Sequence, residues 1–340
     1  MTVLNKQRQR NNKLNIAFIM DPLDTLSLKK DSTLSMIRAA EAKGWEINYL
    51  MQDDLMLNKF EPYCYARPIA LEGNFKESLV QQASEEWYKL GEPILRPLTD
   101  FDIVMMRKDP PFDMEYIYST YILERAAATG VLVVNNPQAI RDCNEKFFAT
   151  AFPQCCPPLL VSRSAKRLKE FHQEQGATIF KPLDGMGGAS IFRVIEDDPN
   201  LPVIIETLTG RGTRQIMAQK FLPEITHGDK RILLIDGEPI PYALARIPME
   251  GESRGNLAAG GKGVGQPLSE RDKWIANEVG PELKRRGIIF AGIDVIGEYL
   301  TEINVTCPTC IRQLDEQFEL DIAMDLLNAV EISALKLKKL

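Results

Sequence analysis

Hydrophobic and polar residues alternate in blocks at the start of the chain, and these blocks predict a strand, a helix and a second strand. The apolar run from Leu14 to Met20 predicts a buried strand. Asp31 is a suitable N-cap for a helix that follows, and Gly44 ends it. Trp45 to Met51 alternates as a second strand. A βαβ beginning indicates a parallel sheet.

The same pattern continues to about residue 136 and predicts an N-terminal parallel α/β lobe. Two further buried strands at 102–106 and 131–134 flank a helix at 117–128. Ligands of such sheets bind beyond the carboxyl ends of the strands. Three polar residues lie at these predicted ends, where they indicate either a site or ordinary polar strand termini: Asp21, Arg107 and Asn135.

After residue 137 the pattern predicts helices mixed with antiparallel hairpins. Within 137–152 we expect a helix that Asp142 caps and that carries Lys146. Asp236-Gly237 between two apolar runs is a strong hairpin signal. Further helices are expected at 165–175, 269–286 and 326–338, a strand at 217–222, and a hairpin at 288–305.

The stretch from Thr178 to Phe192 predicts a strand, a glycine-rich loop and another strand. Backbone N–H groups of such a loop can bind an anion, and Lys181 adds a positive charge at what we expect to be a solvent-facing loop edge. The loop matches neither the P-loop nor the dinucleotide fingerprint. It is therefore a phosphate-binding loop or a plain hairpin turn.

The hairpin near the C-terminus carries a candidate metal site. Glu302 and Asn304 share one face of a strand, and a three-residue turn at 297–299 places Asp294 opposite Glu302. Carboxylate and amide oxygens suit Mg²⁺. A polar, solvent-exposed hairpin face is the alternative.

Residues 248–265 contain six glycines and no periodicity, which is typical of a long loop. Loops of this length in compact domains are usually functional, so we expect a lid, with a linker as the alternative.

Composition narrows the function. The net charge of −6 over 340 residues argues against general nucleic-acid binding. No apolar run is long enough to span a bilayer, and the polar, basic Met1–Lys13 segment lacks the apolar core of a secretory signal, so we expect a solvated tail and a cytoplasmic protein. Cys307 and Cys310 have C-x-x-C spacing, but no second pair or nearby histidine completes a zinc site.

With only two histidines in the chain, a metal is expected to be held by oxygen. A glycine-rich loop with a lysine, a second lysine at position 146, an acidic hairpin and a lid together indicate phosphoryl transfer. That chemistry needs positioning and charge neutralisation rather than a covalent nucleophile.

Several motifs give the chain a family resemblance over roughly residues 14–335. The segments that carry it are Asn144-Glu-Lys-Phe-Phe, Ile179–Arg193, Gly228–Arg231, Arg254–Gly261, Thr301–Thr306, Met20-Asp-Pro, Lys29–Asp31, Arg107–Asp113 and Cys307–Arg312. With these segments the chain resembles the ATP-grasp superfamily and, more closely, the bacterial glutathione synthetase family.

The resemblance implies a fold and an activity. The fold is an N-terminal α/β substrate-binding domain at 14–140, after a tail at 1–13, followed by an ATP-grasp domain at 141–340 whose two α+β subdomains, about 141–222 and 223–340, clamp ATP. The lid is expected at about 247–265. The activity is ATP-dependent joining of glycine to γ-glutamylcysteine through an acyl phosphate.

The resemblance also implies roles for individual residues. Mg²⁺, or Mn²⁺, would be held by Asp294, Glu302 and Asn304. Catalytic roles fall to Arg231, Arg246, Arg254 and Gly261, and the dipeptide would lie near Lys30, Asp31, Arg107, Thr306 and Thr309. ATP would be bound by Lys146, Lys181, Gly185, Gly187, Gly188, Ser190, Asp229 and Asn304, and its adenine by the segment Gln219, Lys220, Phe221 and Leu222, in which Lys220 is given no specific contact.

Two other functions remain open. One is a carboxylate–amine ligase with a different acceptor amino acid, since pockets discriminate a single methylene weakly. The other is a regulatory module that binds ATP without turnover. By resemblance we also expect a homo-oligomer, dimer or tetramer, and neither a nucleic-acid nor a membrane partner.

Overall fold

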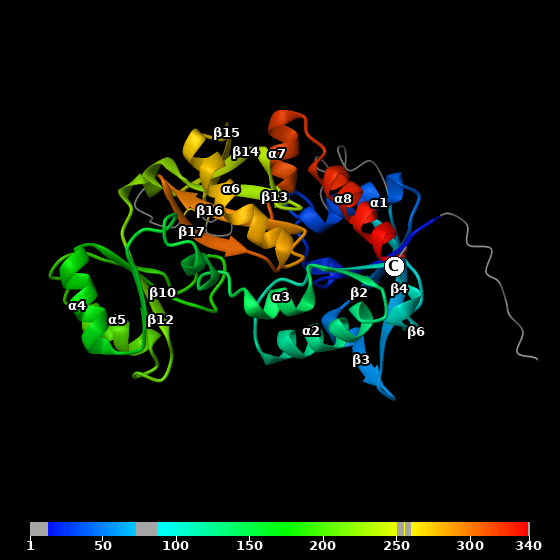
Figure 1. Cartoon of the computed structure of the whole chain (residues 1–340), viewed down its shortest axis with the longest axis horizontal. Coiled ribbons are helices and arrows are strands. Elements are labelled where there is room, and N and C mark those ends of the chain that lie inside the picture. Colours follow the sequence, from blue (N-terminus) through cyan, green and yellow to red (C-terminus); the bar gives the residue numbers. More distant parts are fainter. Residues whose placement is uncertain (1–12, 73–86, 250–254, 256–259, 339–340) are drawn as a thin grey trace, which may run out of the picture.

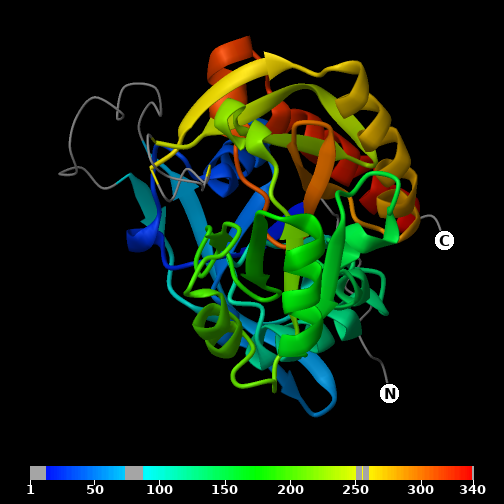
Figure 2. The ribbon, with the colours of Figure 1, turned by 90° about the vertical axis from the view of Figure 1, so that its left-hand side faces the viewer.

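The computed structural model describes residues 13–72, 87–249, 255 and 260–338. Its strands form three sheets, which lie in three regions of the molecule in Figure 1. Figure 2 views the molecule from the side of the smallest sheet. Within the described residues, no helix is both long enough and apolar enough to cross a bilayer.

The first sheet confirms the predicted parallel α/β beginning. Its parallel part has the order β2-β1-β7-β8. Asp31 caps α1 as expected, because its carboxylate accepts a hydrogen bond from the Leu34 N–H at 2.9 Å. The elements are β1 (Asn15–Ile19), α1 (Ser32–Ala42), β2 (Glu46–Leu50), β7 (Ile103–Met106), α2 (Met114–Ala127) and β8 (Leu132–Val134).

An antiparallel extension of this sheet was not predicted. Strand β4 pairs with β2 and also with three short strands, so the sheet continues past its parallel part. Side chains of β4 alternate between buried and exposed only in part, which weakens the sequence signal. The strands are β3 (Leu55–Asn58), β4 (Glu61–Leu71), β5 (Tyr88–Leu90) and β6 (Ile94–Pro97).

The predicted helix around Lys146 is wrong in two respects, its N-cap and its extent. Helix α3 spans Pro137–Asp142 and is capped by Asn136, so Asp142 is its last residue and not its N-cap. Proline at the first helical position favours this start, because its missing N–H needs no partner there. Lys146 follows the helix, in the connection to the 3₁₀ turn η4 (Phe148–Ala151).

The second sheet is antiparallel, with the order β11-β10-β12-β9. Its strands β10 and β11 are the predicted pair that flanks the glycine-rich loop. Leu168, Phe180 and Ile205 form a small core between the sheet and two helices. The elements are β9 (Leu159–Ser162), α4 (Ala165–Gln175), β10 (Thr178–Pro182), β11 (Phe192–Val194), α5 (Leu201–Leu208) and β12 (Ile216–Lys220).

The third sheet is also antiparallel, with the order β15-β14-β13-β16-β17. Both predicted hairpins are present, and Ser269 caps α6 with a capping box. The elements are β13 (Asp229–Ile235), β14 (Glu238–Ile247), β15 (Lys262–Pro267), α6 (Glu270–Arg285), β16 (Phe290–Ile296) and β17 (Tyr299–Asn304).

Strand β15 corrects the C-terminal end of the predicted lid loop. Residues 262–265 were expected to be part of a loop, but they pair with β14. Gly265 lies so close to helix α7 (Ile311–Phe318) that an added Cβ would be 2.4 Å from Cε2 of Phe318. These glycines therefore permit close packing, and of the lid at 247–265 only residues 247–249, 255 and 260–265 lie in the described part.

Two C-terminal helices, α7 (Ile311–Phe318) and α8 (Ile322–Leu337), complete the fold. Helix α7 was not predicted, and α8 begins earlier than expected. Helix α8 lies beside α1 of the first lobe (Figure 1), and Lys43 of that lobe pairs with Glu331 at 2.8 Å. Contacts between helices thus cross the domain boundary that we predicted at residue 140. The position of that boundary stays a prediction.

Candidate active site

A cavity of about 290 Å³ lies between the second and third sheets, and segments from all three parts of the chain line it. It brings together most of the residues that the sequence singled out. Those that line it are Lys146, Lys181, Gly185, Gly187, Gly188, Gln219, Lys220, Phe221, Leu222, Asp229, Arg231, Arg246, Asp294, Glu302, Asn304, Thr306 and Thr309.

Some predicted site residues do not line this cavity. Ser190 and Lys30 are exposed, and Gly261 lies just before β15. Asp31 serves as the cap of α1, and Arg107 is buried with Nη2 donating to the Pro308 carbonyl at 2.9 Å. Arg254 lies outside the described residues.

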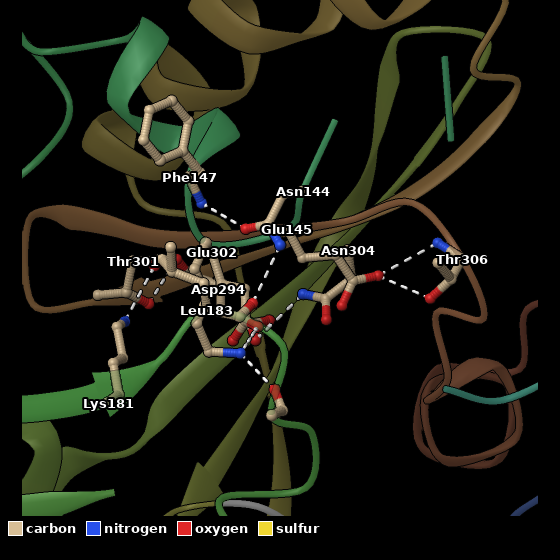
Figure 3. Close-up of polar contacts among 12 residues, drawn as sticks. Asn144, Glu145, Phe147, Lys181, Leu183, Asp294, Thr301, Glu302, Asn304 and Thr306 are labelled. Carbon is tan, nitrogen blue, oxygen red and sulfur yellow. Dashed lines mark hydrogen bonds and ion pairs between the residues drawn. The ribbon is translucent and has the colours of Figure 1, made fainter. Parts of the chain in front are cut away.

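Lys181 is not at a solvent-facing loop edge, as the sequence suggested. It is on β10 and only 5% exposed, and its Nζ donates to Gln219 Oε1 at 3.2 Å and to the Thr301 carbonyl at 3.4 Å. Burial lowers the pKa of the ammonium. Figure 3 shows Lys181 pointing toward the strand that carries Thr301 and Glu302.

The glycine-rich loop next to Lys181 has the backbone that its sequence requires. Gly187 and Gly188 have φ of 62° and 82°, a region that residues with a side chain rarely adopt. Lys146 holds this loop by donating to the Gly185 carbonyl, and it also pairs with Glu302 at 3.0 Å. Burial opposes the charged form of Lys146, but Glu302 outweighs burial and raises the pKa of the ammonium.

The adenine-binding segment predicted at 219–222 forms the end of β12 and the turn after it. Gln219 is buried against Lys181, whereas the Lys220 side chain is exposed. The guanidinium of Arg193 lies 4.0 Å from the centre of the Phe221 ring. Such a cation–π contact holds the ring at the cavity wall.

Asp294 lies in a buried cluster with two arginines. Arg231 contacts both of its oxygens, at 2.5 and 3.0 Å, and Arg246 pairs with it at 2.9 Å. Burial alone would raise the pKa of Asp294, but the two guanidinium groups outweigh burial and lower it. The ion pairs hold the two guanidinium groups at fixed positions in the cavity wall.

Asp229 completes this cluster. One of its oxygens pairs with Arg246, while the other, Oδ1, is buried and has no hydrogen-bond partner among the residues that the structure describes. Burial raises the pKa of Asp229 to about 6. Gly255 packs against the same two residues, since an added Cβ would be 2.3 Å from the Arg246 carbonyl oxygen and 3.1 Å from Asp229 Cβ.

The acidic hairpin has the predicted pairing but not the predicted turn. Asp294 lies opposite Glu302, as expected. Ile296 pairs with Tyr299, however, so the turn has two residues and a bulge between Asp294 and Val295 restores the register. The three oxygen-bearing side chains Asp294, Glu302 and Asn304 therefore do lie close together (Figure 3).

These three side chains form a donor set that fits a hard divalent cation. Asp294 is held by arginines and Glu302 by Lys146, while Asn304 donates to Asp294 at 3.3 Å. Among the described residues no group of three or more His, Cys, Asp or Glu side chains is spaced to hold a metal by itself. The metal assignment therefore stays a prediction.

Two polar residues near the cavity, one buried and one half-buried, have functions that the sequence did not reveal. Asn135, expected at a strand end, donates from Nδ2 to the carbonyls of Phe290 and Val305 at 2.7 and 2.8 Å. Glu145 accepts hydrogen bonds from residues 305 and 306 after β17. Both tie earlier segments to the third sheet, and the position of Glu145 beside Lys146 was the one available sequence signal.

All six cysteines are free. Cys307 lines the cavity and donates to the Arg107 carbonyl at 3.1 Å, and burial raises the pKa of its thiol well above the usual value. The C-x-x-C pair thus forms neither a disulfide nor, within the described residues, part of a cysteine–histidine metal site.

The sequence matches two domain families that are described together. Residues 14–141 match "Prokaryotic glutathione synthetase, N-terminal domain", and residues 145–319 match "Prokaryotic glutathione synthetase, ATP-grasp domain". Among curated proteins, the glutathione synthetase of Pseudomonas aeruginosa is 56% identical over 93% of this chain and 96% of its own length. That of Shewanella oneidensis is 54% identical over 94% of this chain and 98% of its own.

Solved structures support the fold. The ATP-grasp ligase PsnB complexed with a minimal precursor has a TM-score of 0.60 at 19% identity, covering 95% of this chain and 99% of its own. D-cycloserine synthetase DcsG has a TM-score of 0.62 at 13% identity, with the same coverage. An N-terminal domain followed by an ATP-grasp fold of mixed α and β structure is thus confirmed. The chain belongs to the prokaryotic glutathione synthetase family and is an ATP-dependent ligase.

Proposed function

We propose that the chain joins glycine to γ-glutamylcysteine at the expense of ATP and releases glutathione, ADP and phosphate. The observation that carries the proposal is the single cavity in which two buried lysines, two buried arginines and an acidic hairpin meet. Identity above 50% to proteins named glutathione synthetase, over nearly the whole chain, supports the choice of substrates.

The proposed reaction has two steps. The cysteinyl carboxylate attacks the γ-phosphorus of ATP, so that an acyl phosphate forms and ADP leaves. The glycine amine then attacks the acyl carbon, loses a proton and displaces phosphate. Each step gathers negative charge on oxygen, which the buried cations would stabilise.

The residues of the cavity fit these steps. Lys146 and Lys181 would neutralise the phosphates of ATP beside Gly187 and Gly188, whose backbone can approach a ligand closely. Arg231 and Arg246 would face the acyl phosphate and the substrate carboxylates, since their guanidinium groups are fixed by Asp294. The predicted lid would close over the same place, and Gly255 already packs on Arg246.

Asp294, Glu302 and Asn304 would hold Mg²⁺ or Mn²⁺. When bound, the ion would neutralise phosphate charge and align the γ-phosphoryl group. Lys146 and the two arginines hold these carboxylates in place in the structure. Binding of the ion would exchange part of these ion pairs for metal–oxygen bonds.

ADP release, measured with γ-glutamylcysteine in the presence and absence of glycine, tests the proposal. We expect release that depends on both substrates and stops when EDTA removes the metal. Alanine and serine in place of glycine test the alternative acceptors. Glycine-independent ADP release would contradict the proposed ligase reaction. Faster turnover with another amino acid would show that this amino acid, and not glycine, is the acceptor.

We further propose that the protein is a cytoplasmic homo-oligomer. Six free cysteines suit a reducing compartment. Met114, Tyr118 and Tyr121 on α2 are 54%, 51% and 49% exposed at helical spacing, which offers an apolar face for a second copy. Light scattering on the purified protein tests the assembly, and a monomeric mass at micromolar concentration would contradict it.

A further inference from the structure

Glu145 lies between two residues that contact the glycine-rich loop. Asn144 Nδ2 donates to the Leu183 carbonyl at 3.0 Å, and Lys146 donates to the Gly185 carbonyl. The Glu145 side chain points the other way, to the residues that follow β17 (Figure 3). The three consecutive residues therefore connect the loop of the second sheet to the cavity wall formed by the third.

A single oxygen of Glu145 accepts three hydrogen bonds. Its Oε1 lies 3.1 Å from the Val305 N–H nitrogen, 3.2 Å from that of Thr306 and 2.7 Å from Thr306 Oγ1. Because two backbone N–H groups already point at this oxygen, it has no room for a proton of its own. The third contact must be one in which the Thr306 hydroxyl donates.

This arrangement fixes the direction in which the hydroxyl hydrogen of Thr306 points, and Thr306 lines the cavity. A hydroxyl has one hydrogen and two lone pairs, so a hydroxyl that donates to Glu145 can only accept from a ligand. The N–H groups of Val305 and Thr306 are also used by Glu145. This stretch of wall therefore offers acceptors and repels a carboxylate.

We propose that Glu145 is a positioning residue that makes Thr306 an acceptor-only contact for an N–H donor of the substrates. The donor is an ammonium or amide N–H, which glycine or γ-glutamylcysteine can supply. Arg231 and Arg246 can only donate, so they suit the carboxylates of the same molecules. This inference rests on the proposed function. It adds the orientation of an amino-acid substrate, with its N–H donor toward Thr306 and its carboxylate toward the two arginines.

Substitutions of Thr306 test the acceptor role. Thr306→Val keeps the shape and removes the lone pairs, so we expect the KM of one substrate to rise about tenfold or more, as loss of a hydrogen bond to a charged group predicts. Thr306→Ser should restore that KM. The KM of ATP should stay within about twofold, and Thr129→Val is the matched control, because its hydroxyl bonds the Ala126 carbonyl at the end of α2.

The substrate whose KM moves identifies the source of the donor. A change confined to glycine indicates its ammonium group, and a change confined to γ-glutamylcysteine indicates an amide or ammonium of the dipeptide. Unchanged KM values for both substrates in Thr306→Val would overturn the inference while leaving glycine-dependent ADP release intact. Failure of the wild-type chain to release ADP with glycine would instead overturn the proposed function.

Substitutions of Glu145 test the positioning role. Glu145→Gln keeps an oxygen that can accept all three hydrogen bonds, so its KM values should stay near wild type. Glu145→Ala frees the Thr306 hydroxyl and should raise the same KM that Thr306→Val raises. If Glu145→Ala lowers only the thermal midpoint, or raises the KM of ATP alone, the contact is structural and the proposal fails.

Discussion

At the residue scale, the cavity is built from charges that neutralise one another before any ligand binds. Arg231 reaches Asp294 past Gly292, where an added Cβ would be 2.7 Å from the arginine Cδ. Lys181 differs from the arginines, because its contacts within hydrogen-bond distance are the neutral groups of Gln219 and Thr301. A buried ammonium held only by neutral groups costs folding free energy.

Lys181→Met should therefore separate stability from function. We expect ATP affinity to fall about tenfold or more, because a charged contact to phosphate is lost. The thermal midpoint of the ligand-free protein should be unchanged or higher, since the desolvated ammonium is gone. Calorimetry of ATP binding and a thermal scan measure both, with Lys169→Met on the exposed side of α4 as control. A large fall in the midpoint would show that Lys181 holds the fold together.

The half-buried carboxyl of Asp315 should make the free energy of unfolding depend on pH. Burial raises the pKa of its carboxyl from 3.8 to about 6, and its Oδ1 accepts from the Ile322 N–H at 3.0 Å. Between these values the folded chain holds a proton that the unfolded chain has lost, so this group's contribution to stability falls as pH rises.

Asp315→Asn keeps the acceptor but cannot ionise. At pH 4 its free energy of unfolding should match wild type, and by pH 7 it should exceed wild type by up to about 2 kcal/mol, after allowance for partial exposure. Urea unfolding at pH 4, 5, 6 and 7 measures the difference. A difference that does not change with pH would contradict the predicted ionisation.

At the element scale, the sequence predicted which side chains share one face of a strand more reliably than it predicted turn lengths and helix caps. The two-residue period of β17 placed Glu302 and Asn304 on one face, and this survived an incorrect turn length because the bulge compensated for it. Asp142 and Asn136 are both cap formers, and the proline after Asn136 was the overlooked signal. Helix α7 starts at Ile311, and its N-cap residue Cys310 has a left-handed backbone and no side-chain cap, so the sequence contains no start signal.

Other features depend on contacts that no local pattern contains. Lys181 is buried by segments about 40 and 120 residues away in the chain, so its environment exists only in the folded protein. The same holds for Glu145, whose partners lie at least 158 positions further along. The lid was predicted from six glycines and a lack of periodicity, yet residues 262–265 belong to the strand β15.

At the contact between α6 and the turn of the β13–β14 hairpin, we expect Gly280 not to tolerate a side chain. A Cβ on Gly280 would be 2.1 Å from the Gly237 carbonyl oxygen. Gly280→Ala should cost about 2 kcal/mol of unfolding free energy, although alanine favours helices, because a backbone atom must move. Asn277→Ala, exposed on the same helix, should be neutral or stabilising. Equal stability of the two variants in urea unfolding would contradict this prediction.

At the scale of the whole molecule, the first lobe and the third sheet are joined by buried polar bonds. Asn135 makes three of them, because its Oδ1 also accepts from the Phe290 N–H at 3.0 Å. Arg107 adds a bond to Pro308. The cavity walls from the two regions are therefore held in one relative position.

Asn135→Leu should weaken this connection strongly. The substitution leaves one N–H and two carbonyls buried without partners, so we expect the free energy of unfolding to fall by about 2–4 kcal/mol. Asn58→Ala on the exposed part of β3 is the control. Denaturant unfolding followed by two probes, one in each region, measures the effect. A loss below about 0.5 kcal/mol would show that the bonds add little.

The packing of α8 on α1 also has a consequence for synthesis. The two helices are separated by roughly 280 residues, so at about 5–20 residues per second the ribosome makes α8 about 15–55 s after α1. During that interval the apolar residues of α1 lack the core partners that α8 supplies, Leu326, Leu327 and Val330. The growing chain therefore exposes an apolar surface that chaperones can bind until the last helix emerges. A ribosome that stalls before α8 leaves a nascent chain prone to aggregate.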